Sequence, residues 1–448
     1  MNALARVLAL VGRDSFEEHD PAPGDAVRVG SGSVAGRPLL VVAHDEPGLG
    51  GSARRMIDKI LFAHEEAVRR RCPIAYLFDS SSRPLDTRGL FAARDGVGRL
   101  FASQARLLGE VPQVTGVFGP LMSARSFPVA LSDAVALIAE RSFVGLSHPR
   151  MVRALTGEDA TMDALGGVAL HARRSGLADT AVRDEAACLT WIRRYLGYMP
   201  QHRDEPLPLA APGEPRRSGK RLEELVPAGE NTPFSMRALL DEIFDADSRL
   251  EMKRHYAPEI VTALARLDGR PVGVVANEPR SRGGILFVES CRKAMRFARL
   301  CDAYGLPLVF FLDVPGLMVG TRSEELGIVS AAAGLFTVLA RSTVPRVAVV
   351  VRKAYSAGLY AMSGPAFDPD AFLALPTARI GVFGEKAARH VASLNGSAAP
   401  AEPTLEELAQ LGVVDAIVPL EELRAAIVAR LSAVVPRERG RGQGLLPL

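Results

Sequence analysis

Two short runs of small residues mark the places where this chain is best equipped for chemistry. They are GPLMSARSFP at 119–128 and RKAYSAGLYAMSG at 352–364, and each joins an apolar, strand-like run to the start of an expected helix. Successive backbone N–H groups at such a junction, reinforced by the helix N-terminus, stabilise a developing negative charge. We therefore expect an oxyanion hole at both turns. The alternative is that the small residues only permit tight packing of helix against strand.

Motifs for other kinds of catalysis are missing from the sequence. It has no G-x-S-x-G elbow, no Walker A loop, no HExxH segment, and no dinucleotide-binding glycine fingerprint after the first expected strand. Side-chain nucleophile chemistry therefore has no obvious location. Two oxyanion holes that face each other would instead suit a reaction with two carbonyl-like partners, since one such donor stabilises a transition state by about 2.7–4 kcal/mol.

The two turns belong to an internal repeat that covers most of the chain. The segment GRPLLVVAHDEPGLGG, which begins at Gly36, returns as GRPVGVVANEPRSRGG at Gly269, 233 positions later, and the same offset relates the two turns. Asp79 and Asp313 close matching strands at an offset of 234, so one residue was gained in between. A duplication of this size predicts two similar domains and a cleft between them that can hold two different ligands.

The elements expected to position the turns follow a β-α pattern in both halves. Apolar runs such as 38–43 and 73–78 are typical of strands, and residues 54–71 predict an amphipathic helix between them. Residues 199–234 are dense in proline, glycine and charge and lack apolar periodicity, which indicates a linker. We therefore predict two domains, 1–212 and 213–448, with the boundary near Pro212.

Composition is that of an ordinary globular protein and excludes several functional classes. The 448 residues are 48% hydrophobic and 23% charged, and the net charge of +3 gives no sign of nucleic-acid binding. No apolar run approaches the ~20 residues needed to span a membrane, and the N-terminus lacks a signal-peptide pattern. The four scattered cysteines have no metal-ligand spacing and suit a reducing compartment. We expect a cytoplasmic protein with no metal, no membrane contact and no nucleic-acid partner.

Four further stretches carry a resemblance to a known family. They are TGEDATMDALGG with the following SGLAD, APEIVTALARLDGRPVGVVANEP, FARLCDAYGLPLVFFLDVPGLMVG and TVPRVAVVVRKAYSAG. Together they resemble the carboxyltransferase, or beta, subunit of biotin-dependent acyl-CoA carboxylases of the propionyl-CoA and acetyl-CoA type, over nearly the whole chain. The resemblance implies an α/β fold of two tandem crotonase-like (ClpP/crotonase superfamily) β-β-α superhelix domains. It also implies that the N-terminal domain binds an acyl-CoA and the C-terminal domain receives carboxybiotin.

The reaction implied by the resemblance is transfer of a carboxyl group between biotin and the α carbon of an acyl-CoA. One hole would hold the enolate oxygen and the other the biotin ureido oxygen. By position, the catalytic donors are the amides of Ser123, Ala124 and Arg125 in the first domain and of Ser356, Ala357 and Gly358 in the second.

Partners also follow from the resemblance. Biotin would arrive on another polypeptide, since the chain has no Ala-Met-Lys-Met attachment segment. The implied partner is a biotin carboxylase or biotin carrier subunit. The active site would form across a dimer interface, so we expect a homo-oligomer built from dimers, with a hexamer as one such assembly.

Further positions are implied to bind the substrate. An acyl-CoA phosphate would meet a helix start near Gly50, Gly51, Arg54, Arg55 and Lys59, although these cations are equally expected as solvated helix charges. The loop that follows Asp79 in the family is represented here by Ser81, Ser82 and Arg83. Tyr360 would line the acyl pocket, with core packing as its alternative, and the role of Glu385 is open.

The sequence departs from the family at three places that are usually rich in glycine. The first turn has Ser123-Ala124 and the bulky Arg125 instead of a glycine pair, the second has Ser356-Ala357-Gly358 instead of Gly-Gly-Ala, and the 79–83 loop has no glycine. Each added Cβ predicts a clash or a changed turn. Two alternatives therefore stay open: a biotin-independent acyl-CoA decarboxylase or acyl transfer enzyme that needs one hole, and a catalytically silent subunit of a carboxylase.

Overall fold

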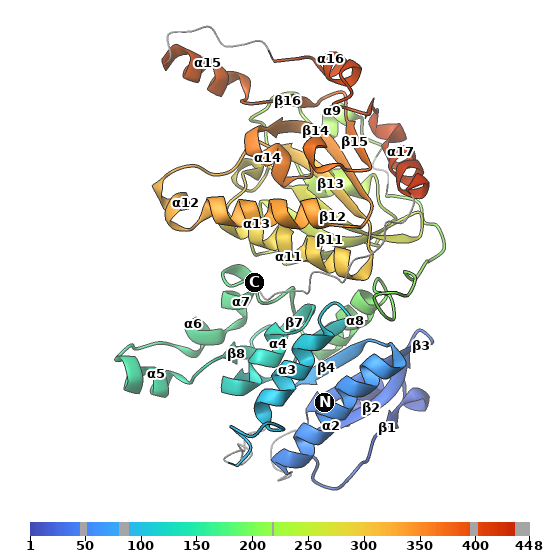
Figure 1. Cartoon of the computed structure of the whole chain (residues 1–448), viewed down its shortest axis with the longest axis vertical. Helices are drawn as coiled ribbons and strands as arrows, with labels where there is room; N and C mark the ends of the chain where they lie inside the picture. Colours follow the sequence, from blue (N-terminus) through green and yellow to red (C-terminus); the bar gives the residue numbers. More distant parts are fainter. Residues whose placement is uncertain (45–51, 80–88, 217–218, 395–401, 435–448) are drawn as a thin grey trace. The chain divides into compact units, whose positions relative to one another are not determined.

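The structure is a computed structural model that describes residues 1–44, 52–79, 89–216, 219–394 and 402–434 (Figure 1). The chain divides into two units, of which the first comprises Met1–Pro208 and the second begins at Leu209. Each unit has its own sheet and its own apolar core. The different ligands expected for domains 1–212 and 213–448 stay predictions.

The sheet of the first unit has seven strands in the order β1-β2-β3-β4-β5-β7-β9. The first three strands are antiparallel, and the pairs from β3 onward are parallel. A separate parallel pair, β6 with β8, lies beyond the end of β5. The bounds are β1 Glu17–Glu18, β2 Val27–Val34, β3 Arg37–His44, β4 Ile74–Phe78, β5 Gln113–Val117, β6 Pro120–Met122, β7 Ala134–Ile138, β8 Phe143–Gly145 and β9 Thr180–Val182.

The second unit repeats this plan with the order β10-β11-β12-β13-β14-β15-β17. Again the first three strands are antiparallel and the later pairs parallel, while β16 pairs with the extended end of β14. The bounds are β10 Leu250–Met252, β11 Ile260–Leu267, β12 Arg270–Asn277, β13 Leu308–Val314, β14 Arg346–Tyr355, β15 Ala371–Ala374, β16 Arg379–Gly381 and β17 Ala416–Ile417.

Strand register reproduces the sequence repeat pair by pair. Leu40 lies opposite Ile74 in the first sheet, and Gly273 lies opposite Leu308 in the second, which gives the offsets of 233 and 234 found in the sequence. The match also reaches back to β1 and β10, because Glu18 pairs with Gly30 as Glu251 pairs with Ala263. The duplication therefore begins well before Gly36, and the expected α/β fold is confirmed.

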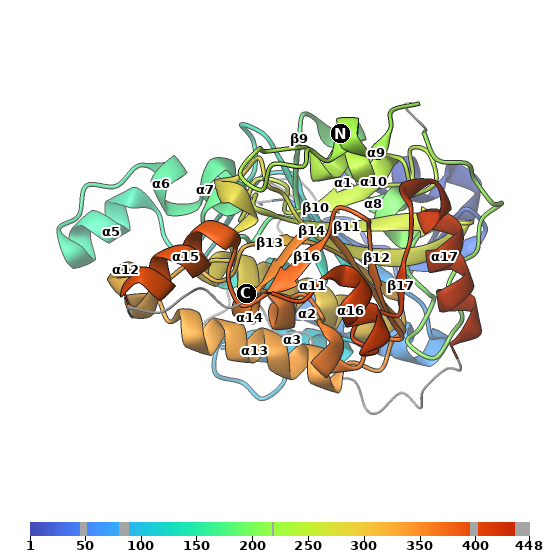
Figure 2. The same ribbon diagram turned by 90° about the horizontal axis from the view of Figure 1, so that it is seen from above.

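Helices cover both faces of the second sheet. On one face α9, α10 and α17 pack their apolar residues against the strands, and α11 and α13 cover the opposite face (Figures 1 and 2). The helices of this unit are α9 Leu222–Leu225, α10 Met236–Asp241, α11 Val288–Tyr304, α12 Thr321–Glu325, α13 Ile328–Arg341, α14 Ser356–Ala361, α15 Glu385–Leu394, α16 Leu405–Gln410 and α17 Leu420–Ala433.

The first unit has the same arrangement, with α2 and α3 on one face of its sheet and α1 and α8 on the other. Helix α2 spans Ala53–Arg70, close to the predicted 54–71, because the Ser52 side chain caps its start and Arg71 ends it in the left-handed conformation. The other helices are α1 Ala3–Val11, α3 Val97–Leu107, α4 Phe127–Ala130, α5 Pro149–Thr156, α6 Met162–Gly166, α7 Val168–Arg173 and α8 Glu185–Leu196.

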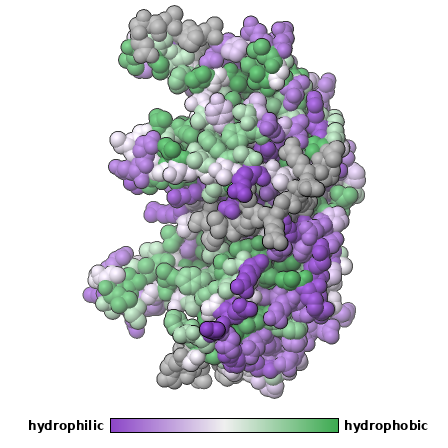
Figure 3. Space-filling model, viewed as in Figure 1, coloured by the Kyte–Doolittle hydropathy of each residue, from purple (hydrophilic) through white to green (hydrophobic). Residues whose placement is uncertain are grey.

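Several elements expose apolar side chains on the surface. Among the described residues, no helix has both the length and the hydropathy needed to cross a membrane. Apolar residues nevertheless gather on α5, where Met151 and Leu155 are exposed (Figure 3). Val329 on α13 and Leu394 on α15 are also exposed. Such surfaces on a folded chain are typical of contacts with another chain.

Candidate active site at two matched turns

The first predicted turn comes after strand β6 and leads into α4 through a short 3-10 segment, Ser123–Arg125. Ser123 is exposed and has a φ of +56°, in the left-handed region that favours glycine. Ser126 anchors the turn with two hydrogen bonds. Its backbone N–H donates to the Ser123 carbonyl at 3.0 Å, and its hydroxyl donates to the Gly145 carbonyl on β8 at 2.7 Å. The turn is therefore held by the β6–β8 pair.

The second predicted turn joins strand β14 directly to α14. Ser356 is exposed and has a φ of +53°, so it takes the same conformation as Ser123. The first N–H groups of a helix have no carbonyl partner within that helix. Two serines in matched left-handed conformations thus place equivalent amides at the start of a helix in both units. The two serine-containing turns therefore share one left-handed conformation, and the expected effect of replacing the family's glycines stays a prediction.

The third residue of each turn is where the two sites differ. Gly358 is buried, and a Cβ atom added to it would lie 2.7 Å from Val314 Cγ2 and 2.9 Å from Gly316 Cα. The second turn thus needs a glycine because its backbone packs closely on the end of β13. Arg125 holds the equivalent position in the first turn with a half-buried side chain, and burial lowers its pKa.

Arg125 acts electrostatically on His44, a residue that the sequence analysis did not single out. His44 ends β3 at the position equivalent to Asn277. Burial, and then the nearby charge of Arg125, lower the pKa of His44 to about 4. Its Nε2 is buried and has no hydrogen-bond partner among the described residues. His44 is therefore a neutral imidazole close to the first turn.

Asn277 has a clear structural role in the second unit. Its side-chain nitrogen donates to the Gly284 carbonyl at 3.1 Å, and its oxygen accepts from the Asp313 backbone N–H at 3.3 Å. It thus ties the end of β12 to the end of β13. The sequence could have drawn attention to His44, because the repeat aligns it with Asn277 at the offset of 233.

Aspartates that close the two central strands are neutralised by arginines from different elements. Asp313 pairs with Arg352 of β14 at 2.9 Å, and both side chains are almost completely buried. Asp79 pairs with Arg6 of α1 at 2.7 Å. Each guanidinium also lies over an aromatic ring, Phe234 for Arg352 and Phe118 for Arg6, at 4.9 and 4.6 Å. These aspartates hold the ends of the two central strands in place.

The cations predicted to meet an acyl-CoA phosphate have protein partners in the structure. Arg55 and Lys59 both bind Asp25, at 2.6 and 2.9 Å, and Arg54 binds Asp95 at 2.9 Å. Burial opposes ionisation of Asp25, but hydrogen bonds from Arg55 and Lys59 hold its pKa at about 2. Arg54 is the most exposed of the three cations. Phosphate binding at this helix start stays a prediction.

Lys59 has a counterpart in the repeat that explains its burial. Its ammonium group donates to the Asp20 carbonyl at 3.2 Å, in addition to Asp25. Lys293, 234 positions later, is fully buried and donates to four carbonyl oxygens, including that of Lys253 at 2.9 Å. Burial lowers the pKa of Lys293 to about 7. In both units the ammonium group of this lysine holds the loop that leads into the second strand of the sheet, β2 in the first unit and β11 in the second.

The other predicted site residues differ in how far the structure describes them. Tyr360 lies on α14 with 45% of its surface exposed, and its ring is 6.4 Å from that of Phe367. Outside the described residues lie Gly50, Gly51, Ser81, Ser82, Arg83 and the side chain of Glu385. The described residues contain no group of three or more His, Cys, Asp and Glu side chains able to hold a metal ion. All four cysteines are buried and reduced.

Comparison with known proteins gives these turns a context. A family model described as a carboxyl transferase domain matches residues 8–442. The uncharacterized carboxylase YngE of Bacillus subtilis is 36% identical over 94% of this chain and 86% of its own length. The propionyl-CoA carboxylase carboxyltransferase subunit of Haloferax mediterranei is 34% identical over 84% of this chain and 72% of its own.

A solved structure extends the similarity to the whole fold. The transcarboxylase 12S hexamer with hydrolyzed methylmalonyl-coenzyme A bound superimposes with a TM-score of 0.88 at 29% identity. The match covers 100% of this chain and 92% of that one. The duplicated sheets and both turns therefore lie within a shared architecture.

Proposed function

This chain belongs to the carboxyl transferase domain family, and we infer that it is an enzyme that transfers a carboxyl group to or from the α carbon of an acyl-CoA. Biotin carried on a separate protein is the other participant in the reaction. The observation that carries the catalytic assignment is the pair of turns at Ser123 and Ser356, which share one left-handed conformation at the start of a helix.

We propose that the amides of the first turn hold the thioester oxygen of the acyl-CoA. Loss of the α proton, or of the α carboxyl group, moves negative charge onto that oxygen as the enolate forms. Backbone N–H groups aimed at this position stabilise the enolate without having to reorganise. Because these donors belong to the main chain, the identity of Ser123 and Ala124 matters less than their conformation.

The amides of the second turn, Ser356 to Gly358, are proposed to hold the ureido oxygen of biotin. Their residues fit this role, since Ser356 is exposed, Gly358 brings the backbone close to the end of β13, and the N–H groups begin a helix. Carboxybiotin supplies the carboxyl group when bound. The chain itself orients the two reactants and steadies the charge that develops on each oxygen.

Assembly and location complete the proposal. We propose a homo-oligomer built from dimers, with a hexamer as the full assembly, because exposed apolar residues on α5, α13 and α15 require cover. A biotin carboxylase or biotin carrier subunit would bring the biotin. A cytoplasmic location is proposed from the four buried cysteines, none of which forms a disulfide.

Substrate placement is proposed on the first unit. Arg54, at the exposed start of α2, would meet an acyl-CoA phosphate, while Arg55 and Lys59 shape this helix start through Asp25. Gly50, Gly51, Ser81, Ser82 and Arg83 are proposed to complete the site. Tyr360 is proposed to line the acyl pocket, because its ring is half exposed on α14 beside the second turn.

One incubation tests the proposed reaction. The pure protein is mixed with methylmalonyl-CoA or malonyl-CoA, with and without free biotin, and the thioesters are monitored by mass spectrometry. Turnover that requires biotin is the expected result. Decarboxylation without biotin would instead support the biotin-independent enzyme. If no CoA ester is consumed or raises the melting temperature, the chain is a silent subunit and the enzymatic proposal fails.

A further inference from the structure

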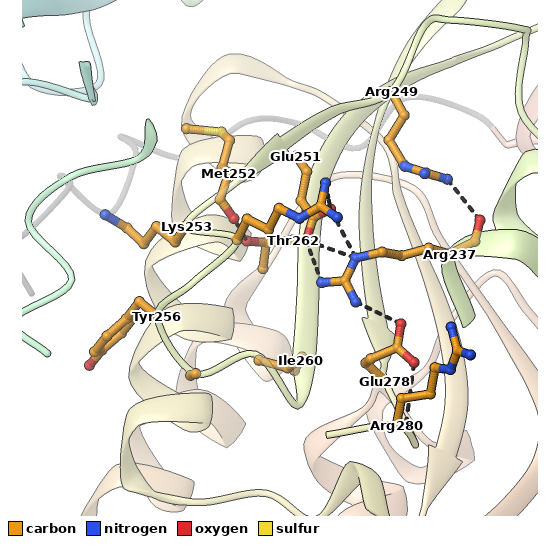
Figure 4. A network of polar contacts seen from close by, with 12 residues as sticks. Arg237, Arg249, Glu251, Met252, Lys253, Tyr256, Ile260, Thr262, Glu278 and Arg280 are labelled. Carbon is orange, nitrogen blue, oxygen red and sulfur yellow. Dashed lines mark hydrogen bonds and ion pairs between the residues drawn. The ribbon is translucent and has the colours of Figure 1, made fainter. Parts of the chain in front are cut away.

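A pocket of about 460 Å³ lies beside the first strands of the second unit, and four of its lining residues are arginines. Three of them are Arg237 of α10, Arg249 before β10 and Arg280 after β12 (Figure 4). The fourth is Arg254, which follows β10. We propose that this pocket binds a small phosphorylated organic ligand of nucleotide size. The proposal is independent of the carboxyl transfer reaction.

Arg237 forms the fixed base of the pocket. It donates to Glu251 at 2.5 Å and to Glu278 at 2.6 Å, and both carboxylates are largely buried (Figure 4). Burial opposes its charge, but these two partners raise the pKa of Arg237. Glu278 also accepts from the backbone N–H of Arg280 at 3.3 Å. One buried network thus sets the position of two of the four arginines.

The charges of Arg254 and Arg280 are only weakly compensated, whereas Arg249 is paired. Arg280 is exposed, and its guanidinium forms no ion pair with any described residue. Arg254 is 4.0 Å from the carboxylate of Glu251, and its side chain is 63% exposed. Arg249 pairs with Asp241 at 2.6 Å, a carboxylate that is itself half exposed and screened by water. The guanidinium donors of Arg254 and Arg280 are therefore available to a ligand.

The chemistry of the lining favours an anion whose oxygens can accept paired hydrogen bonds from one guanidinium group. Arg237 and Arg249 are paired with carboxylates, whereas Arg254 has only a 4.0 Å contact with Glu251 and Arg280 has no ion pair with a described residue. A guanidinium fork matches the oxygens of phosphate and holds them by two parallel hydrogen bonds. The pocket volume falls in the range typical of small organic ligands and exceeds what a single ion needs. A phosphorylated organic molecule satisfies both conditions.

The duplication shows that the fold does not need these arginines. By the offset of 233, their counterparts in the first unit are Leu4, Phe16, Pro21 and Pro47. Pro47 lies outside the described residues. Next to the Pro21 and Arg254 pair the backbone conformation is shared, because the preceding residues Asp20 and Lys253 both have positive φ, +43° and +53°. Two of the three carboxylates have acidic counterparts at this offset, Glu251 in Glu18 and Glu278 in Asp45, whereas the counterpart of Asp241 is Leu8. The second copy therefore carries an arginine cluster that its twin folds without.

Calorimetric titration of the full-length protein with ADP, and separately with pyrophosphate, tests the proposal. We expect one saturable site whose affinity falls as salt is added. Arg280→Gln should weaken binding about tenfold, and the double variant Arg254→Gln/Arg280→Gln about a hundredfold, because each loses charged hydrogen bonds. Both residues are exposed, so folding should be unaffected. Arg430→Gln, an exposed arginine on α17, is the matched control and should bind like the parent.

The two probes divide the possible outcomes. Tight binding of both would show that the phosphates alone are recognised, and tighter binding of ADP that the nucleoside also contributes; either supports the proposal. Absence of saturable binding, or affinity unchanged in the double variant, would overturn it. The proposal is also overturned if the double variant loses acyl-CoA binding to the same extent, because the pocket would then belong to the acyl-CoA site. Binding of a glutamate-rich peptide, with no binding of either probe, would likewise overturn it.

Discussion

The turn at Ser123 and the turn at Ser356 share a left-handed serine but differ at the residue two positions after it. In the second turn, Gly358 lets the backbone pack against the end of β13, where a Cβ atom would collide with Val314 and Gly316. In the first turn Arg125 stands at that position with its side chain half buried near His44. The left-handed conformation of the turn can thus be kept while its surroundings diverge.

The supports behind the turns differ in the same way. Each unit needs an aspartate at the end of a central strand and a buried arginine to neutralise it. The second unit takes that arginine from β14, whereas the first takes Arg6 from the N-terminal helix, where it also binds Glu185. Duplicated folds therefore conserve the charge balance rather than the residue that provides it.

The largest expected effect concerns the two buried ion pairs, Asp313 with Arg352 and Asp79 with Arg6, and is a loss in the free energy of unfolding. Asp313→Asn leaves the guanidinium of Arg352 buried without its carboxylate, so the free energy of unfolding should fall by about 3–5 kcal/mol. Asp79→Asn should cost less, because Arg6 keeps Glu185 at 3.0 Å. Urea unfolding of both variants measures the difference, and equal losses would show that the two pairs are equivalent.

The second-largest expected effect is on kcat and concerns the third residue of each turn, Gly358 in the second turn and Arg125 in the first. Gly358→Ala forces its Cβ against the β13 end and displaces the amides, so kcat should fall by about 10²–10³-fold. Arg125→Ala adds no new atom to the first turn and serves as the structural control, with an unchanged circular dichroism spectrum. If Gly358→Ala is folded and fully active, the second turn has no catalytic role.

Stability against pH distinguishes His44 from its counterpart Asn277. The pKa of His44 in the folded state, about 4, lies below the ordinary value near 6.5, so the unfolded chain takes up the proton first. The free energy of unfolding should therefore decrease between pH 6.5 and 4, by about 1.4 kcal/mol per pH unit for this group. His44→Asn should remove that part of the slope in urea titrations at several pH values, while buried His64 continues to contribute. An unchanged slope would contradict the assignment.

The smallest expected effect concerns the feature that the turns share. Ser123→Gly and Ser356→Gly relieve left-handed strain of about 1–2 kcal/mol, against which the added freedom of the unfolded chain acts. We expect each variant to gain about 1 kcal/mol or less in free energy of unfolding, with closely similar gains at the two turns. A loss at either turn would mean that its serine side chain makes a stabilising contact.

The repeat, the α/β fold, the strand ends and both turns could be predicted from the sequence because they depend on local patterns. Apolar alternation marks strands, and the common offset aligns Ser123 with Ser356. The ion pairs could not be predicted, since Arg6 and Asp79 are 73 residues apart and meet only through the packing of α1 on the sheet. The role of Lys59 was likewise hidden, because its burial against Asp25 depends on the loop before β2.

The measurement that tests the central claim most directly is a structure of the protein with a stable analogue of an acyl-CoA enolate bound. The account predicts that the thioester oxygen lies about 2.7–3.1 Å from the amide nitrogens of the first turn, next to Ser123. An analogue whose oxygen is held elsewhere, with those amides bonded to protein carbonyls, would contradict it.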